Sequence, residues 1–402
     1  MIMTTTTIWD KCMYFVLLLL AIASCLSTGA TSCAIGLGAV FMIAQRICTG
    51  RLPDMDRRVG MVVLLFSLLQ FLIAALSVNP AASFAEVLAA TYRFAPLFFA
   101  MMYIRRKEQL RWIFIALILA VFIDDCMALY QFLHNELPEG FNTTHIFFGD
   151  FVLMAMPILL LGIYKDYMPV WSRLLAAVTL VFSFAMLILS YARGSWIALA
   201  AMLLVWILFD RRMRRVAIGL TVAGVLAFTA GMCISSDFQG RVVSVVNPEH
   251  ENNTERVLMW ESALQITRDY PVFGIGQDQF ALIYNSKYIS PLARERSRDD
   301  NPAHGLGHPH NNFLKTSSEG GAVGVLAFLL LYGYLLYALY GRYREESWSL
   351  QLSPALMGIL VWVALQAAGL TDTNITQVPI MREYWFLMGT LLAAGKIELG
   401  SC

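Results

Sequence analysis

Long hydrophobic runs separated by short polar segments make up most of the chain. A helix needs about 20 mainly apolar residues to cross the hydrocarbon core of a bilayer. The runs therefore predict an all-α polytopic membrane protein with about twelve spanning helices. Their expected ranges are 12–28, 33–50, 60–78, 84–104, 112–133, 147–164, 172–190, 195–210, 216–234, 322–341, 354–370 and 380–396.

One polar segment is far longer than the others and divides the chain into three parts. Residues 1–234 carry the first nine predicted spans, residues 235–321 form the long loop, and residues 322–402 carry the last three spans. Loops of this length inside a compact protein are often functional. We therefore expect residues 235–321 to form part of the functional site.

The long loop has predicted elements of its own. Residues 254–271 place apolar side chains at helical spacing, which predicts a surface helix. Thr254 can cap the start of that helix, and Pro271 marks its end. We expect a turn at residues 273–276 and a flexible segment at residues 293–307.

Positive charge is concentrated on one side of the predicted spans. The residues on that side are Arg46, Arg51, Arg57, Arg58, Arg105, Arg106, Lys107, Arg111, Lys165, Arg173, Arg211, Arg212, Arg214, Arg215, Arg342 and Arg344. The short loops and helix ends on the other side carry only Arg193 and Arg382. Short loops rich in lysine and arginine stay in the cytoplasm. Both termini are therefore predicted to be cytoplasmic, with the long loop on the outer side.

Composition agrees with a membrane protein and narrows the possible partners. The chain is 58% hydrophobic and 14% charged, whereas soluble domains carry about 25% charged residues. The net charge of +1 indicates no particular partner, but the lack of a basic tail argues against a nucleic-acid partner. The seven cysteines are scattered, so we expect neither a disulfide framework nor a zinc site. The apolar run after Lys11 is similar to a signal peptide, but we expect it to remain as the first spanning helix.

Three histidines, His304, His308 and His310, lie close together at the end of the long loop. They are compatible with a simple polar loop, with a metal site that adds Asp299 and Asp300, or with a general base. No recognised metal-ligand spacing is present, so we expect no metal. An imidazole titrates near neutral pH, which suits a base at a membrane surface.

The last of these histidines begins a wider pattern. His310 and Asn311 are followed, after nine residues, by Gly321 and, after two more, by Gly324. This spacing resembles the signature of the O-antigen ligase and polymerase superfamily.

Two other segments resemble the same superfamily. SYARGSW at residues 190–196 resembles its arginine on the outer face. NTERVLMWESALQITRDYPVFGIG at residues 253–276 resembles its loop segment, in which Arg256 and Trp260 precede a Pro-x-x-Gly-x-Gly turn. The resemblance covers about residues 180–335, and its motifs follow in order on one predicted membrane face.

The resemblance implies a GT-C-like fold and a glycosyltransferase at the periplasmic face of a bacterial inner membrane. Such enzymes move a glycan from an undecaprenyl diphosphate carrier to an acceptor hydroxyl. His310 would take the hydroxyl proton, and Arg193 and Arg256 would bind the departing diphosphate. A guanidinium stays charged and binds phosphate oxygens through two hydrogen bonds. We expect a metal-independent, inverting transfer that needs no cofactor.

The layout favours an O-antigen ligase, whose acceptor is the lipid A-core. The polymerase of the same superfamily, which joins repeat units on the same carrier, shares the motifs, as does a relative that transfers glycans to protein serines. A lipid-linked glycan transporter is the alternative from another class. It predicts repeats and interrupted helices near the bilayer centre, and the sequence gives clear signs of neither.

Three residues are expected to support the base. His308 would shape the loop, and Asn311 follows the base directly in the signature. Asp372 is predicted on the outer face near the last span, where it would orient His310 or the acceptor.

The remaining expectations concern arginines. Arg256 has no acidic side chain at helical spacing, which leaves it available for a ligand. Gly194, beside Arg193, leaves room for a ligand to approach closely. Arg93 lies within a predicted span at the same depth as Asp124 and Asp125, so we expect an ion pair between them. That pair would be structural first and part of a lipid-phosphate cavity second.

Overall fold

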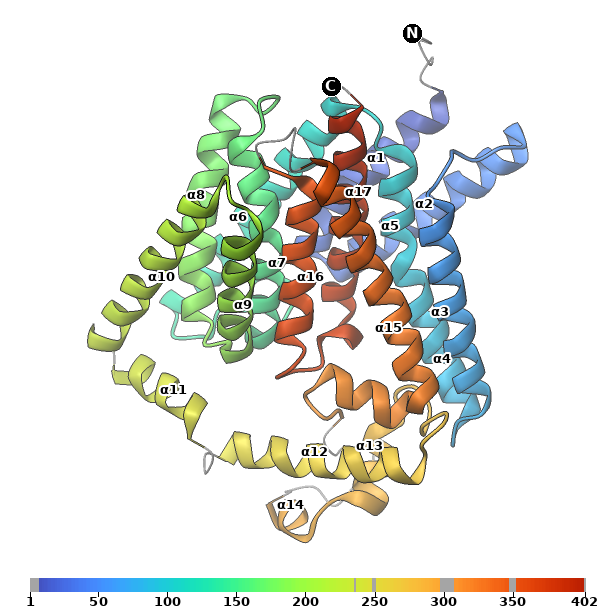
Figure 1. The fold of residues 1–402 in the computed structure, drawn as a ribbon, viewed down its shortest axis with the longest axis vertical. Coiled ribbons are helices and arrows are strands. Elements are labelled where there is room, and N and C mark those ends of the chain that lie inside the picture. Colours follow the sequence, from blue (N-terminus) through green and yellow to red (C-terminus); the bar gives the residue numbers. More distant parts are fainter. Residues whose placement is uncertain (1–6, 235, 248–250, 297–306, 347–351, 401–402) are drawn as a thin grey trace.

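A computed structural model describes residues 7–234, 236–247, 251–296, 307–346 and 352–400, and these residues form helices without strands. Figure 1 shows long helices packed side by side, with a layer of shorter helices across one end. The bundle contains α1 (Ile8–Leu26), α2 (Thr28–Thr49), α3 (Arg57–Ala75), α4 (Pro80–Thr91), η1 (Tyr92–Phe94), α5 (Ala95–Tyr103), α6 (Lys107–Leu133), α7 (His145–Tyr164), α8 (Val170–Leu189), α9 (Arg193–Phe209), α10 (Arg214–Ile234), α15 (Asn312–Glu346), α16 (Pro354–Ala368), η4 (Asn374–Thr376) and α17 (Val378–Leu399). The outer layer contains α11 (Ser236–Val246), α12 (Glu251–Asp269), α13 (Phe280–Ile283), η2 (Tyr284–Tyr288) and α14 (Pro291–Arg296).

The bundle is built to lie in a bilayer. Within the described residues, nine helices are long and apolar enough to cross a membrane, when α4, η1 and α5 are counted as one. Two apolar helices are shorter, α9 with 17 residues and α16 with 15. Each predicted range overlaps at least one helix, which confirms an all-helical multi-pass membrane protein. The number of helices that cross the membrane stays a prediction.

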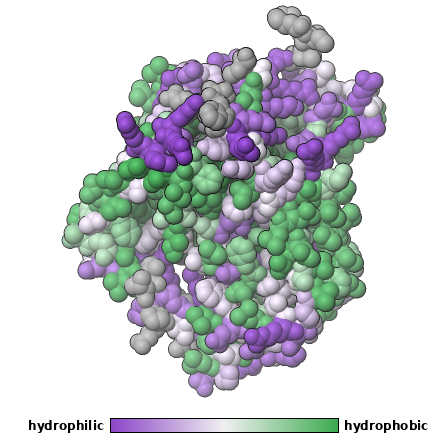
Figure 2. Space-filling view, viewed as in Figure 1, coloured by the Kyte–Doolittle hydropathy of each residue, from purple (hydrophilic) through white to green (hydrophobic). Residues whose placement is uncertain are grey.

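On the face shown in Figure 2, a hydrophobic belt crosses the bundle between two more hydrophilic ends. The helices inside the belt are α7 and α17, which are buried along most of their length. By contrast, α10 buries only Ala217 among its described side chains, although the helix is strongly apolar. An apolar helix face that no protein covers is what a lipid environment requires. The described ends of the chain lie together, opposite α11–α14 (Figure 1).

Two predicted helices differ from the observed ones. The range 84–104 is interrupted at η1, so Arg93 lies in a short 3-10 segment ahead of Pro96. The surface helix begins at Glu251, one turn before its predicted start, and Thr254 therefore lies inside α12 rather than at its cap. Within residues 293–307, the structure describes the start as part of α14, and residues 297–306 lie outside the described part of the chain.

The turn after α12 is locked into a break in α15. At Gly321 the backbone has φ 59° and ψ −155°, which interrupts the helix. A Cβ there would come within 2.5 Å of the backbone of Val272, and one at Gly274, with φ 64°, would come within 2.3 Å of Glu319. Only glycine fits such positions without strain. Four backbone hydrogen bonds join the segments: Ala322 N to Pro271 O (2.8 Å), Val323 N to Val272 O (3.0 Å), Ile275 N to Ser318 O (3.1 Å) and Gly276 N to Glu319 O (2.9 Å).

The outer layer also has a small hydrophobic core. Its buried side chains come from α12, α13, η2 and the intervening turn, and Leu314 of α15 packs against them. The first turns of α15 are therefore fixed between the bundle and the outer layer. His310 and Asn311 directly precede those turns.

Candidate active site

His310 is held in a strained backbone conformation between α12 and the start of α15. Its φ is 48°, a left-handed value that non-glycine residues adopt at a cost of about 1–3 kcal/mol. On one side, the Trp260 indole Nε1 donates a 2.8 Å hydrogen bond to Pro309 O. Such strain persists only where neighbouring contacts fix the backbone. Trp260 therefore helps to aim the imidazole.

Asn311 and Asn312 fix the other side of His310. The Asn311 carboxamide oxygen accepts hydrogen bonds from the backbone N–H groups of Phe313 (2.9 Å) and Leu314 (3.0 Å), which caps α15. Its Nδ2 donates to Leu370 O at 2.9 Å. Asn312 N donates to Gly369 O at 2.7 Å. These bonds tie the start of α15 to the loop between α16 and α17.

That loop brings Asp372 to the imidazole. His310 Nδ1 lies 3.1 Å from Asp372 Oδ1, and the two residues are 62 positions apart in the chain. The Asp372 side chain is 5% exposed, whereas that of His310 is 25% exposed. The predicted neighbourhood of Asp372 and His310 is therefore present in the fold.

The charge of Asp372 determines which nitrogen of His310 is available. Burial alone raises the pKa of Asp372, but the hydrogen bond and charge of His310, a backbone hydrogen bond from Thr373 and the charge of Arg256 together lower it below its usual value. The carboxylate is thus ionised near neutral pH and can only accept a hydrogen bond. We assign the proton of neutral His310 to Nδ1, which leaves the lone pair on Nε2 for a substrate.

Arg256 reaches the same carboxylate from α12. Its Nη2 lies 3.7 Å from Asp372 Oδ2. Arg256 precedes Trp260 by about one helical turn on α12. The sequence analysis expected Arg256 to lack a local partner, and its partner indeed comes from 116 positions away. Arg256 Nη2 is beyond hydrogen-bond distance of Asp372, and the Arg256 side chain remains 21% exposed.

Arg193 lies at the start of α9, close enough to Arg256 for the two charges to interact. Its Nη1 donates to Ser244 O at 3.0 Å and to Ser244 Oγ at 3.2 Å. The expectation that Gly194 leaves room for a ligand is wrong. A Cβ at Gly194 would lie 2.3 Å from Thr371 Oγ1, so the space is filled by this loop of the protein itself.

The structure adds a third arginine that sequence reasoning missed. Arg241 lies on α11, where its Nη2 approaches Tyr191 O at 3.5 Å, and its buried Nε has no hydrogen-bond partner. Burial and then the charge of Arg256 lower the pKa of Arg241. Three guanidinium groups whose charges interact in this way offer several hydrogen-bond donors that suit an anion. Only the fold reveals it, because Arg241 stands in no recognised motif.

His308 packs against the base. The two imidazole rings lie 4.4 Å apart, and the buried His308 Nδ1 has no hydrogen-bond partner. Burial, and then the charge of His310, lower the pKa of His308 to about 4. His308 is therefore neutral near pH 7. His304, Asp299 and Asp300, the other members of the alternative metal site, lie outside the described residues.

One group in the described residues could nevertheless hold a metal ion. It consists of His308, His310 and Asp372, whose ligand atoms all lie within 4.8 Å of one another. Two imidazoles and a carboxylate are a donor set that suits zinc and other transition metals. The geometry therefore keeps a metal-assisted alternative open beside the general base.

A buried network of side-chain hydrogen bonds joins the site to the helices of the bundle. Asn374 donates through Nδ2 to Asp150 at 3.1 Å, and it accepts from Asn312 Nδ2 at 2.7 Å. Asp150, on α7, also accepts from Ser195 Oγ at 2.7 Å. The network links α7, α9, η4 and α15. Nothing in the sequence indicated a role for Asp150. In the fold, hydrogen bonds through Asn374 connect Asp150 to Asn312, two residues after His310.

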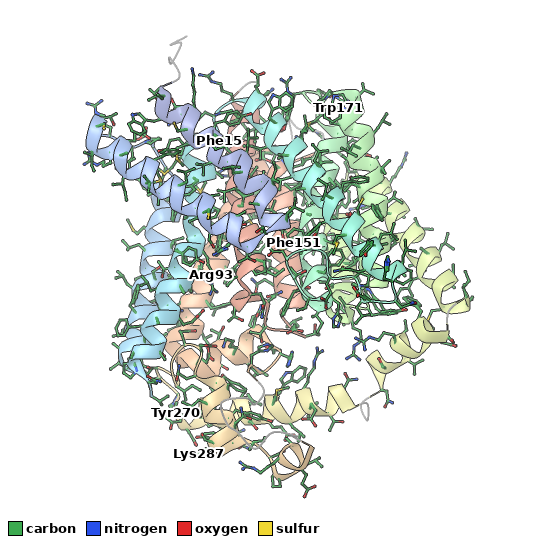
Figure 3. All side chains as sticks on the ribbon, turned by 180° about the vertical axis from the view of Figure 1, so that it is seen from behind. Phe15, Arg93, Phe151, Trp171, Tyr270 and Lys287 are labelled. Atoms are coloured by element: carbon green, nitrogen blue, oxygen red, sulfur yellow. The ribbon has the colours of Figure 1, made fainter. Side chains whose placement is uncertain are left out.

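Arg93 is separate from this group. The expected pair with Asp124 or Asp125 is wrong, because Arg93 Nη2 instead binds Glu86 at 3.0 Å and Nη1 donates to Thr376 O at 3.1 Å. The carboxylates of α6 have other donors: Asp124 accepts from Phe141 N and Asp125 from Ser183 Oγ. Figure 3 shows Arg93 inside the bundle, away from the outer layer that carries Tyr270 and Lys287.

Comparison with known proteins agrees with this arrangement. Residues 178–329 match the family model described as O-antigen ligase, and the match spans Arg193, Arg241, Arg256 and His310. This match supports the O-antigen ligase and polymerase superfamily for residues 178–329. Members of this superfamily are glycosyltransferase-like membrane enzymes that act on lipid-linked glycans. The predicted superfamily is therefore confirmed.

One curated relative has no stated function. It is an uncharacterized protein of Haemophilus influenzae, 23% identical over 227 residues, which are 52% of this chain. The match spans 55% of the length of that relative, so the chain covers about half of it. The likeness therefore adds no information about substrates.

Proposed function

We propose that this protein is an O-antigen ligase of the bacterial inner membrane. It would transfer a glycan from undecaprenyl diphosphate to the lipid A-core at the periplasmic face. The observation that carries the proposal is the His310–Asp372 pair, set beside three arginines on the outer side of an O-antigen ligase domain. A base and an anion site are the two groups that this transfer needs.

In the proposed mechanism, Asp372 holds His310 in the tautomer with a free Nε2. Nε2 takes the proton of the acceptor hydroxyl while the hydroxyl oxygen attacks the anomeric carbon of the donor glycan. The bond from that carbon to the diphosphate oxygen breaks, and its electron pair stays on the diphosphate. Direct attack inverts the configuration at the anomeric carbon.

The arginines act on the leaving group. Negative charge grows on the diphosphate as the bond breaks, so Arg193, Arg241 and Arg256 stabilise the transition state more than the ground state. Removal of one such group costs about 10²- to 10³-fold in rate. The ion pair with Asp372 keeps Arg256 next to the base and leaves part of its guanidinium exposed.

The proposal is tested in a strain that lacks the chromosomal gene. We expect lipopolysaccharide core without O-antigen and an accumulation of polymer on the carrier. The wild-type protein should restore O-antigen attachment, and His310→Ala should not. His134→Ala is the matched control, since His134 is an exposed histidine at the outer end of α6. O-antigen attachment restored by His310→Ala contradicts the proposed base.

The same strain separates the ligase from the polymerase. A polymerase deficiency leaves core capped with single repeat units, because attachment continues while polymerisation stops. That result would overturn the ligase assignment and retain the superfamily. The transporter alternative has some support from the interruption of the fourth predicted span at η1. It predicts that His310→Ala retains function.

A further inference from the structure

A cavity with polar and apolar walls lies beside the first turns of α15. It has a volume of about 110 Å³, is partly open, and is lined by α3, α4, η1, α15, η4, α17 and the turn after α12. Figure 1 shows α3 and α4 on one side of α16, and α9 and α11 on the other. The cavity and the arginine site therefore approach His310 from different sides.

Short segments connect this cavity with the proposed active site. Lys315 and Thr316 line the cavity from the first turns of α15, directly after His310 and Asn311. Thr376 lines it from the loop that carries Asp372, and its carbonyl accepts the hydrogen bond of Arg93. A molecule in the cavity would thus contact the two segments that follow His310 and Asp372 in the chain.

The charges of the cavity walls are compensated. Arg93 is paired with Glu86 at 3.0 Å, and Lys315 is paired with the buried Glu319 at 2.6 Å. Asp278 adds a further negative charge to the lining. A diphosphate needs free positive charge, which these walls do not offer. The lining suits an uncharged ligand instead.

Two side-chain amides supply hydrogen bonds at the wall. Gln277 Nε2 donates to Gln70 Oε1 at 2.6 Å. This bond leaves the side-chain NH₂ group of Gln70 and the side-chain Oε1 of Gln277 for another partner. The Glu86 side chain is 31% exposed and offers acceptor capacity beside them. Donors and acceptors set close together in this way match the hydroxyl groups of a sugar.

Aromatic side chains line another part of the cavity. Phe94 packs on Trp385 with ring centroids 4.5 Å apart, and Phe66 packs on Phe94 at 5.9 Å. All three line the cavity. The faces of a sugar ring carry C–H groups, which pack well on aromatic side chains, while its rim carries hydroxyl groups. The cavity is partly open, so part of a sugar ring can extend beyond its volume of about 110 Å³.

We propose that this cavity binds a sugar ring of the acceptor glycan, with Gln70 and Gln277 as its hydrogen-bonding groups. The inference rests on the proposed function, because only a transferase needs an acceptor site beside the base. The donor diphosphate would then bind on the arginine side, and the acceptor sugar on the side of α3 and α4. His310 would stand between the two.

Steady-state transfer in proteoliposomes tests the proposal. Purified lipid A-core is the acceptor, and undecaprenyl diphosphate-linked glycan is the donor. We expect Gln277→Ala and Gln70→Ala each to raise the KM for lipid A-core about 5- to 10-fold, which corresponds to the loss of about one hydrogen bond. The KM for the donor and kcat at saturating acceptor should stay within twofold of wild type.

A matched control and a binding measurement complete the test. Gln265→Ala removes an exposed glutamine of α12 that does not line the cavity, and it should leave both KM values unchanged. Core oligosaccharide freed of its lipid should bind the His310→Ala protein in nanodiscs, and Gln277→Ala in that background should weaken the binding 5- to 10-fold. This readout needs no turnover.

The outcomes separate the two proposals. If the acceptor KM of Gln277→Ala and Gln70→Ala stays within twofold, or if the donor KM rises instead, the cavity assignment is wrong. The ligase proposal then stands on the His310 result. If His310→Ala still transfers glycan, the proposed mechanism is wrong whatever the cavity binds.

Discussion

At the scale of single residues, the site depends on contacts between positions that are distant in the chain. His310 is aimed by Trp260 through Pro309 O and paired with Asp372. The sequence predicted His310, Asp372 and Arg256 individually, because motifs and residue chemistry mark them. It did not predict that Arg256 pairs with Asp372, because that pair arises only when α12 lies across the α16–α17 loop.

Arg93 shows the opposite outcome. The equal predicted depth of Arg93, Asp124 and Asp125 in the membrane favoured an ion pair between them. Instead, Arg93 pairs at 3.0 Å with Glu86, which lies seven residues earlier in the chain. A sequence argument based on depth cannot see which helix faces meet. The interruption at η1 also turns the Arg93 side chain toward Thr376 O.

His308 leads to a prediction about pH. Its folded-state pKa is lowered to about 4, whereas the unfolded value is about 6.5. Between those values the unfolded chain binds a proton that the folded protein does not, so stability falls as pH drops from about 6.5 to about 4. We expect His308→Gln to reduce this loss. The measurement is the apparent Tm in detergent at a series of pH values, and an unchanged pH dependence contradicts it.

At the scale of elements, hydrophobic runs predicted the helices well because a bilayer demands long apolar helices. Irregular backbone was harder to predict. The sequence indicated a turn at residues 273–276, and the structure shows that this turn occupies the break of α15 at Gly321. Both glycine motifs therefore serve one junction between the outer layer and the bundle.

This junction can be tested with two glycine variants of α15. Gly321→Ala forces a Cβ against Val272 at a φ of 59°, so we expect a strong loss of folded protein and of activity. The strain alone is about 1–3 kcal/mol, and the clash adds to it. Gly333→Ala is the control, because nothing lies within 4 Å of its Cβ position. The measurement is the yield and the Tm of both variants in detergent. The proposed junction is contradicted if Gly321→Ala has the same yield and Tm as Gly333→Ala.

At the scale of the whole molecule, the described ends of the chain lie opposite the outer layer that carries α12 and the site (Figure 1). The basic loops predicted to be cytoplasmic fit that arrangement. The multi-pass architecture and the superfamily are established. The choice between ligase and polymerase is not encoded in the motifs, since both enzymes need the same base and the same anion site.

The two-sided layout gives this chemistry a physical basis. The arginines of α9, α11 and α12 interact with one another beside Asp372, the partner of His310. The cavity lies between α3, α4 and α17 and is lined by Lys315 and Thr316, which follow His310 in the chain. Under the proposed function, a lipid-borne donor and a lipid-borne acceptor would reach one base without competing for one pocket. The metal-assisted alternative uses the same His308, His310 and Asp372 and differs only in its dependence on a divalent ion.

The most direct measurement of the central claim is the transfer rate of His310→Gln in proteoliposomes that contain EDTA. Glutamine keeps a polar side chain but cannot accept the hydroxyl proton. We expect kcat to fall by about 10²- to 10⁴-fold, the usual contribution of a general base, while the KM for the donor stays within twofold and the wild type remains active in EDTA. A variant rate within tenfold of wild type, or wild-type activity that EDTA abolishes and a divalent ion restores, would contradict the account.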